Sequence, residues 1–241
     1  MRKSIAAIAV ATVALTGCGR SHAEEPGPTV SRSFQVGNFT ELEAAGPFDV
    51  TVRTGANPGV QVQGNKALVD KLQVDVEGSK LRIRPERSHS WFGGWHSSTR
   101  GKATVMVTVP QLRAASLAGA GAIHIDKVQG DDFNGNIAGA GDLVLQSINV
   151  RNLKVSIAGS GSLTGSGKAQ SADYDIAGSG DVKGEGIASE ELNVSIAGAG
   201  SVRAHATRAA KVDIMGAGDV EVTGGAKCEV HKMGSGDVRC S

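Results

Sequence analysis

The stretch Val194-Ser195-Ile196-Ala197-Gly198-Ala199-Gly200-Ser201-Val202-Arg203 decides the fold. On both sides of its Gly-Ala-Gly turn, apolar and polar residues alternate with a period of two, which is typical of a half-buried β-strand and not of a helix. Glycine at both turn positions allows positive φ angles without a Cβ clash, so the chain can corner sharply there. The stretch therefore predicts two strands joined by a tight corner.

This corner occurs seven times, as Gly-Ala-Gly or Gly-Ser-Gly beginning at residues 119, 139, 159, 178, 198, 216 and 234. A near-constant period of this kind, close to 20, indicates a solenoid, in which each repeat forms one coil stacked on the next. We expect an all-β, right-handed parallel β-helix with two or three short strands per coil. Coils about 4.8 Å apart make this part roughly 29 Å long.

Alignment of the repeats predicts which side chains are buried. The inward side chains are aliphatic: Val155, Ile157, Leu163, Val194, Ile196, Val202, Val212, Ile214 and Val220. The outward side chains are polar or charged: Ser156, Asp175, Lys183, Ser195, Arg203, Asp213 and Glu221. One outward position repeats along the coils as Ser116, Asn136, Ser156, Asp175, Ser195 and Asp213. Ile157, Ile176, Ile196 and Ile214 should form one interior file.

The first residues predict export. Arg2 and Lys3 precede a mainly apolar run from Ile5 to Leu15, which suits a signal-peptide core and is too short for a membrane span. Leu15-Thr16-Gly17-Cys18 resembles a bacterial lipobox, so we expect residues 1–17 to be a lipoprotein signal peptide and Cys18 to become a lipidated N-terminus. The alternative is an ordinary secretory signal with a chance Cys. Gly19 stands where Asp would resemble an inner-membrane retention signal, which favours the outer membrane, on its periplasmic or outer side.

The mature chain should begin with a flexible tether over residues 18–29, which contains Glu24-Glu25-Pro26-Gly27-Pro28. Removal of Arg2 and Lys3 leaves 23 of the 25 basic residues against 24 acidic ones. With no basic stripe, nucleic acid is not expected as a partner. The expected partners are the membrane, through the lipid anchor, and a glycan or envelope protein.

Two cysteines remain after Cys18, and both fall in the last coil. They are Cys228, in the final alternating run, and Cys240, next to the end of the chain. In an oxidising compartment we expect them to form a disulfide that protects the unpaired edge of the end coil. A metal-binding or redox role is the alternative, but neither cysteine belongs to a C-x-x-C motif.

Residues 30–115 lack the glycine repeat but contain alternating runs at 34–36, 48–52, 60–62, 72–76, 81–83 and 103–109. These runs predict strands. Residues 65–71 predict a short helix capped by Asn65. We expect residues 30–115 to cap or continue the N-terminal end of the regular coils in 116–241, because repeat arrays need atypical terminal units.

One insertion, residues 88–98, concentrates aromatic residues. It contains His89, Trp91, Phe92, Trp95 and His96. Exposed aromatic side chains on a loop indicate a contact surface for glycan or protein. The alternative is that both tryptophans fold back to cover a coil edge.

These features together resemble the head GIN domain family, labelled putative auto-transporter adhesins. The resemblance rests on Gly46-Pro47-Phe48-Asp49-Val50, on Val107-Thr108-Val109-Pro110-Gln111-Leu112, on the Ser-Ile-Ala-Gly-Ser-Gly units and on a terminal Lys-Met-Gly-Ser-Gly-Asp-Val. The family's Gly-Ile-Asn motif is altered here to Gly46-Pro47-Phe48-Asp49. The resemblance covers about residues 34–239 and implies an exported β-helical protein, often lipid-anchored, with no established catalytic residues.

Metal and cofactor sites find little support in the sequence. Asp142, Asp181, Asp219 and Asp237 each follow a corner, but only once per coil, and Ser162 and Ser201 interrupt the series. Calcium needs six to eight oxygen ligands, so we interpret these aspartates as turn caps that accept backbone N–H groups. His124, His205 and His231 fall on different coils and do not converge. No phosphate loop is present, and we expect no cofactor.

Three functions remain open. The preferred one is an adhesive or structural envelope module without catalysis. A polysaccharide-degrading or -modifying enzyme is the second, because Asp175 and Asp213 should lie about 10 Å apart, near the outer limit for an inverting carboxylate pair. The third is an envelope signalling accessory that binds a protein through an open coil end, against which an intact Cys228–Cys240 bridge would argue.

Overall fold

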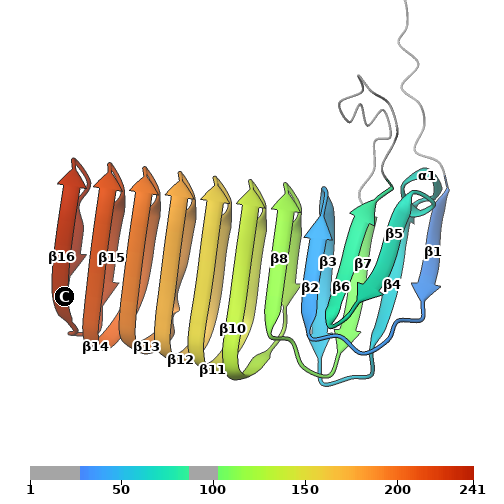
Figure 1. Ribbon diagram of the computed structural model, residues 1–241, viewed down its shortest axis with the longest axis horizontal. Coiled ribbons are helices and arrows are strands. Elements are labelled where there is room, and N and C mark those ends of the chain that lie inside the picture. Colours follow the sequence, from blue (N-terminus) through green and yellow to red (C-terminus); the bar gives the residue numbers. More distant parts are fainter. Residues whose placement is uncertain (1–27, 87–102) are drawn as a thin grey trace, which may run out of the picture.

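A computed structural model describes residues 28–86 and 103–241. Within these ranges the chain is nearly all β, and 17 strands belong to one continuous sheet. The sheet winds into an elongated β-solenoid in which the strands lie side by side from β16 at one end to β1 at the other (Figure 1). The fold class expected from the glycine repeat is confirmed. No helix among the described residues has the length and hydropathy needed to cross a bilayer.

The regular coils are formed by long strands that run from one glycine corner to the next. They are β10 (Val128–Gly139), β11 (Asp142–Gly159), β12 (Ser162–Gly178), β13 (Asp181–Gly198) and β14 (Ser201–Gly216), and each pairs in parallel with the next. The expectation of two or three short strands per coil was wrong. Each coil still bends at a second place, marked by register shifts such as that between Leu145 and Ile148. Parallel pairing resumes after this shift and continues to the next glycine corner.

The interior file of isoleucines is confirmed. Ile157, Ile176, Ile196 and Ile214 lie directly opposite one another in successive coils, and each is at most 3% exposed. All nine side chains predicted to point inward are buried. The thin core of β-branched side chains therefore extends through all the regular coils.

The glycine corners are needed for two reasons. At Gly159, φ is +129°, a value that L side chains rarely adopt, and a Cβ would lie 2.3 Å from the carbonyl oxygen of Gly139 in the preceding coil. The close approach arises because the central residue of each regular corner donates its amide to the first glycine of the corner before it, at 2.8–3.0 Å. Stacked corners thus form a hydrogen-bonded edge that has no room for a side chain.

The N-terminal part continues the solenoid instead of forming a separate cap. Strands β2 (Glu41–Ala45) and β3 (Phe48–Thr54) pair in parallel with β8 (Ala114–Gly119) and β9 (Ala122–Ile125). On their other side, β2 and β3 pair with β6 (Lys80–Pro85) and β7 (Ala103–Val109). Gly46 forms the corner between β2 and β3, with φ +134°, and its amide donates to Ala118 at 2.8 Å.

Antiparallel strands cover the N-terminal end. Strand β4 (Gly59–Asn65) pairs with β7 and with β1 (Thr29–Phe34), and β5 (Leu72–Glu77) pairs with β6. Helix α1 (Lys66–Val69) begins after Asn65, whose Oδ1 accepts the amide of Ala67 at 2.9 Å, so the predicted cap is confirmed. Thr29, placed in the tether by the sequence, is already part of β1 and lies opposite Asn65.

The C-terminal end consists of β15 (Asp219–Thr223), β16 (Lys227–Gly234) and β17 (Val238–Cys240). The predicted disulfide between Cys228 and Cys240 is present. These cysteines lie opposite the buried residues Ala210 and Val222 of the preceding coil, so the bridge crosses the open end of the core. Lys232 occupies the isoleucine file opposite Ile214, and its Nζ donates to the carbonyl of Gly236 at 2.7 Å. An inward lysine at an edge opposes pairing with another sheet.

Candidate functional site

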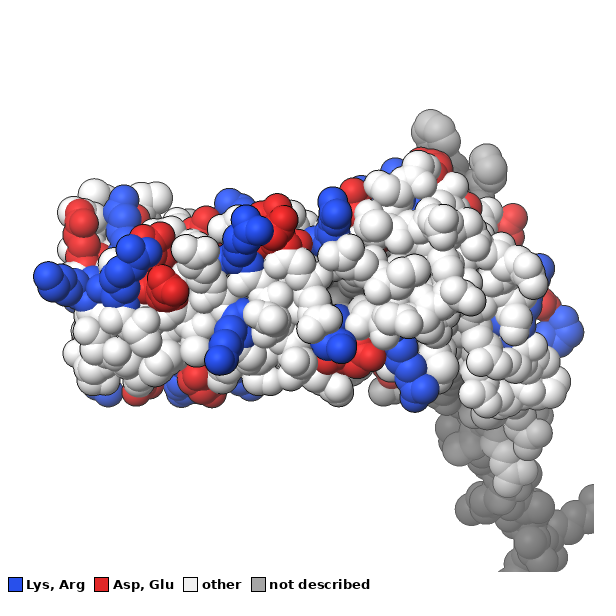
Figure 2. Space-filling model, turned by 90° about the horizontal axis from the view of Figure 1, so that it is seen from below, with Lys and Arg blue, Asp and Glu red and all other residues white. Residues whose placement is uncertain are grey.

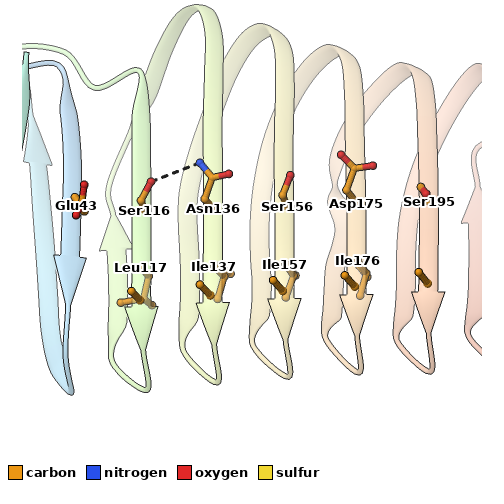
Figure 3. A pocket seen from close by; sticks show the side chains of 15 residues that line it. Glu43, Ser116, Leu117, Asn136, Ile137, Ser156, Ile157, Asp175, Ile176 and Ser195 are labelled. Atoms are coloured by element: carbon orange, nitrogen blue, oxygen red, sulfur yellow. Dashed lines mark hydrogen bonds between the residues drawn. The ribbon is translucent and has the colours of Figure 1, made fainter.

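A groove of about 560 Å³ runs across the coils on one outer face of the solenoid. One side of it is the outward column predicted from the repeat, here called the polar column: Glu43, Ser116, Asn136, Ser156, Asp175 and Ser195. These side chains lie in a row on successive strands (Figure 3), and Asn136 Nδ2 donates to Ser116 Oγ at 3.5 Å. The strand register confirms the predicted order from Ser116 to Asp213. Glu43, on β2, is an addition that the repeat could not predict.

The floor of the groove is a second column, two residues further along each strand, here called the alanine column. It comprises Ala118, Ala138, Ala158, Ala177 and Ala197. Residues two apart on a strand point to the same side, so the alanine methyl groups lie beside the polar column. Small side chains here leave the backbone surface open as a groove. The same position continues in the last two coils as Met215 and Met233.

The charges at the groove are acidic and paired. Asp175 Oδ2 lies 3.2 Å from Lys154 Nζ of the preceding coil. This carboxylate, by hydrogen bonding and by its charge, raises the pKa of Lys154, and Asp173 adds to the effect. Glu43 Oε2 lies 3.6 Å from both Lys80 and Arg82. The groove lining therefore contains two carboxylates whose cationic partners stand outside it.

The carboxylate spacing gives little support to a hydrolytic site. Glu43 and Asp175 are four coil steps apart, or about 19 Å, whereas the carboxylates of an inverting glycosidase are about 6.5–9.5 Å apart. Asp175 and Asp213 are two steps apart, as predicted, or about 10 Å. Asp213, however, is not among the groove residues and lies 3.6 Å from Lys211.

The interpretation of the aspartates after the corners as turn caps is wrong for two of them. Asp142 and Asp181 accept hydrogen bonds from Ser162 and Ser201, which follow the next corners along the solenoid. Asp219 does accept a backbone amide, that of Asp237, at 2.9 Å. In the described ranges no group of three or more His, Cys, Asp or Glu side chains is arranged to hold a metal ion. The serines that interrupt the acidic series are thus its hydrogen-bond donors.

The three histidines lie apart, as predicted. His124 lies opposite Thr51 and Val144 near the N-terminal end. His205 Nδ1 is 3.2 Å from Thr223 Oγ1, and exposed His231 is 3.0 Å from Glu229.

Seen from below (Figure 2), basic and acidic residues are interspersed along the molecule, with no continuous patch of one sign on this side.

Several predicted site residues lie outside the described ranges. They are the lipidation candidate Cys18 and, within the insertion 88–98, His89, Trp91, Phe92, Trp95 and His96. Sequence reasoning missed the alanine column as a groove floor, although the signal was present: alanine recurs immediately before the corner glycine in five successive repeats, 118 to 197.

The fold is similar to crystal structures of bacterial proteins. A putative adhesin from Bacteroides fragilis superposes with a TM-score of 0.79 at 21% identity, over 90% of this chain and 99% of that chain. A putative lipid binding protein from Parabacteroides distasonis gives a TM-score of 0.70 at 22% identity, over 89% and 97% of the two chains. At such identities the likeness shows the fold alone. No protein of curated function matches the chain in sequence.

The family is shown by a match in sequence. The family model described as "Putative auto-transporter adhesin, head GIN domain" matches residues 38–226. This range runs from just before β2 to just after β15 and includes the whole groove. The resemblance noted at Gly46–Val50 and in the glycine repeats is thereby confirmed. The chain belongs to the head GIN domain family of putative auto-transporter adhesins.

Proposed function

We propose that this protein is a non-catalytic binding module of the cell envelope, held at the membrane by a lipid on Cys18, whose groove contacts an extended, uncharged glycan. The groove is the observation that supports this function. It sets a row of hydroxyl, amide and carboxylate groups beside a floor of methyl groups over successive coils. A pyranose chain presents C–H faces and hydroxyl edges, which match such a floor and such a row. Many weak contacts in register suit adhesion.

The charges of the groove narrow the class of polymer. Its two carboxylates disfavour acidic polysaccharides and nucleic acids, because like charges repel along the whole contact. Lys154 is outside the lining and is already paired with Asp175. A neutral chain therefore fits better than an anionic one.

The groove is tested by placing a large side chain on its floor. Ala158→Arg should block the groove near its middle, whereas Thr164→Arg adds the same side chain on the outward column that already holds Lys183 and Arg203. We expect Ala158→Arg to weaken binding to immobilised neutral polysaccharides at least tenfold and Thr164→Arg to change it less than twofold. Equal losses, or no loss, in the two variants would show that the groove is not the contact surface.

The anchor and the aromatic loop are tested separately. Cys18→Ala should move the protein from the membrane fraction to the soluble fraction and remove the acyl mass at the N-terminus. A variant that stays in the membrane with its mass unchanged would contradict lipidation at Cys18. The loop over 88–98 is a second proposed contact, and glycan or envelope-protein binding by the Trp91→Ala/Trp95→Ala variant decides whether it takes part.

A further inference from the structure

The last two coils depart from the repeat at one corner of the outer face. From Ala118 to Ala197 the position before the corner glycine is always alanine, but in the last two coils it is Met215 and Met233. The two methionines lie directly opposite each other in parallel strands, about 4.8 Å apart at the backbone. Met215 and Met233 are 62% and 74% exposed. Two large apolar side chains therefore stand next to each other on the surface, which is more informative than a single exposed one.

A histidine joins this pair. His231 precedes Met233 by two residues on β16, so both side chains point outward on the same face, with Cα atoms about 6.6 Å apart. In the preceding coils the position of His231 is held by Asp213, Ser195 and Asp175. Lys232, between His231 and Met233, turns inward to Gly236, which keeps its ammonium group away from the cluster.

We propose that Met215, Met233 and His231 form a binding site for a soft monovalent metal ion, Cu(I) or Ag(I). Thioether sulfur selects Cu(I) among common biological metals, and imidazole is also a copper ligand. The carboxylate of Glu229, next to His231, favours a bound cation, whereas that of Asp213 is already paired with Lys211 at 3.6 Å. Because the only two cysteines of the described ranges are joined in a disulfide, thioether groups are the soft ligands that remain there.

Glu229 is a positioning residue for this site. Its Oε1 lies 3.0 Å from Nε2 of His231. A ligand histidine commonly donates its second ring N–H to a carboxylate, which fixes the tautomer and leaves the other nitrogen for the metal. With Nε2–H donating to Glu229, Nδ1 is the metal ligand. The site thus has three ligands and one orienting carboxylate.

The test is an Ag(I) titration of the full chain carrying Cys18→Ser, in which no free thiol competes and no reductant is needed that could open the disulfide. The methionine ε-methyl groups are observed by NMR. We expect the Met215 and Met233 methyl signals to shift together and to saturate at one equivalent, with those of Met1 and Met106 unchanged. Equal shifts of all methionines, or no saturation, would overturn the proposal.

Variants assign the ligands. Met215→Leu and Met233→Leu keep size and apolarity but remove sulfur, and each should weaken Ag(I) binding at least tenfold, as should His231→Gln. Met106→Leu, at a methionine on β7 that is 37% exposed, is the matched control and should bind as tightly as the parent. Unchanged affinity in the Met215→Leu/Met233→Leu variant would overturn the site, and unchanged affinity in His231→Gln would remove the imidazole from it.

Discussion

Ser162 Oγ donates a hydrogen bond of 2.6 Å to Oδ1 of Asp142, its neighbour in the preceding coil. Ser201 makes the same bond to Asp181. From Asp142 to Asp219, acidic and hydroxyl residues therefore alternate along the edge where the strands leave the glycine corners, and only the last step, from Asp219 to Asp237, places two aspartates next to each other. Parallel neighbours are about 4.8 Å apart, so consecutive aspartates would stack like charges. Alternation replaces that repulsion with a charge-assisted hydrogen bond.

The substitution Ser162→Asp should therefore destabilise the fold by about 1–3 kcal/mol at neutral pH, because it removes a donor and places three carboxylates in succession. Ser162→Asn is the matched control, since asparagine has nearly the same shape as aspartate but is neutral and can donate to Asp142. Urea unfolding at low and high salt measures both variants. The loss in Ser162→Asp should shrink with added salt, and equal stability of the two variants would contradict the electrostatic argument.

The corner glycines offer a second test. Gly198 has φ +140°, and a Cβ there would lie 2.1 Å from the carbonyl oxygen of Gly178. Gly198→Ala should cost about 3 kcal/mol or more, because backbone strain and a clash with a fixed carbonyl add together. Gly37 has no atom within 4 Å of its Cβ position, so Gly37→Ala should leave the melting temperature nearly unchanged. Similar losses in the two variants would mean that the corners tolerate side chains.

The glycine period made most of the fold predictable. Once the corners were aligned, the inward file through Ile157 and Ile196 and the outward polar column followed from strand alternation alone. The glycine period could not reveal contacts made by residues that precede the first Gly-x-Gly corner. Glu43 joins the polar column only because β2 pairs with β8, a strand far along the chain, and no Gly-x-Gly corner marks that pairing. The antiparallel strands β1, β4 and β5 likewise lie beyond the repeat.

The site was less predictable than the fold, because its features depend on register between coils. In the sequence, Ser162 is only an interruption of an acidic series, and its hydrogen bond to Asp142 becomes visible only when the two coils are aligned in register. The pairing of Met215 with Met233 was open to detection, since the two residues stand at the same position of successive repeats, each directly before a corner glycine. Methionine is a less common metal ligand than histidine, cysteine or a carboxylate, so this repetition by itself does not indicate a metal site.

The disulfide gives a third prediction. Replacing both Cys228 and Cys240 with serine should free the end coil, since the chain-entropy contribution of a bridge of this loop size is about 3 kcal/mol. In a solenoid each coil contacts only its neighbours. Amide exchange should therefore accelerate in β16 and β17 and remain slow in β11–β13. Chemical reduction of the parent protein is the control and should give the same pattern, whereas equal loss of protection in all coils would contradict local capping.

Tyr174 gives a pH-dependent prediction, because it is the single tyrosine of the chain and is 1% exposed. It lies in the core between Val155 and Val194 of the adjacent coils. Burial disfavours the phenolate and raises the pKa of Tyr174. Because the folded pKa lies above the unfolded value of about 10, the stability contributed by the neutral phenol is complete below pH 10 and is lost as the pH rises above it. Phenolate absorbance should thus stay absent above pH 10 and appear only as the protein unfolds.

The control for that titration is Tyr174→Phe, which keeps the ring but cannot ionise. Its stability, measured by urea unfolding from pH 8 to pH 11.5, should fall less steeply above pH 10 than that of the parent protein, because both share every other alkaline titration. If phenolate instead forms with a midpoint near pH 10 while circular dichroism still shows the native sheet, the ring must be reached by solvent. That result would contradict the burial of Tyr174 in the packed interior of the β12 coil.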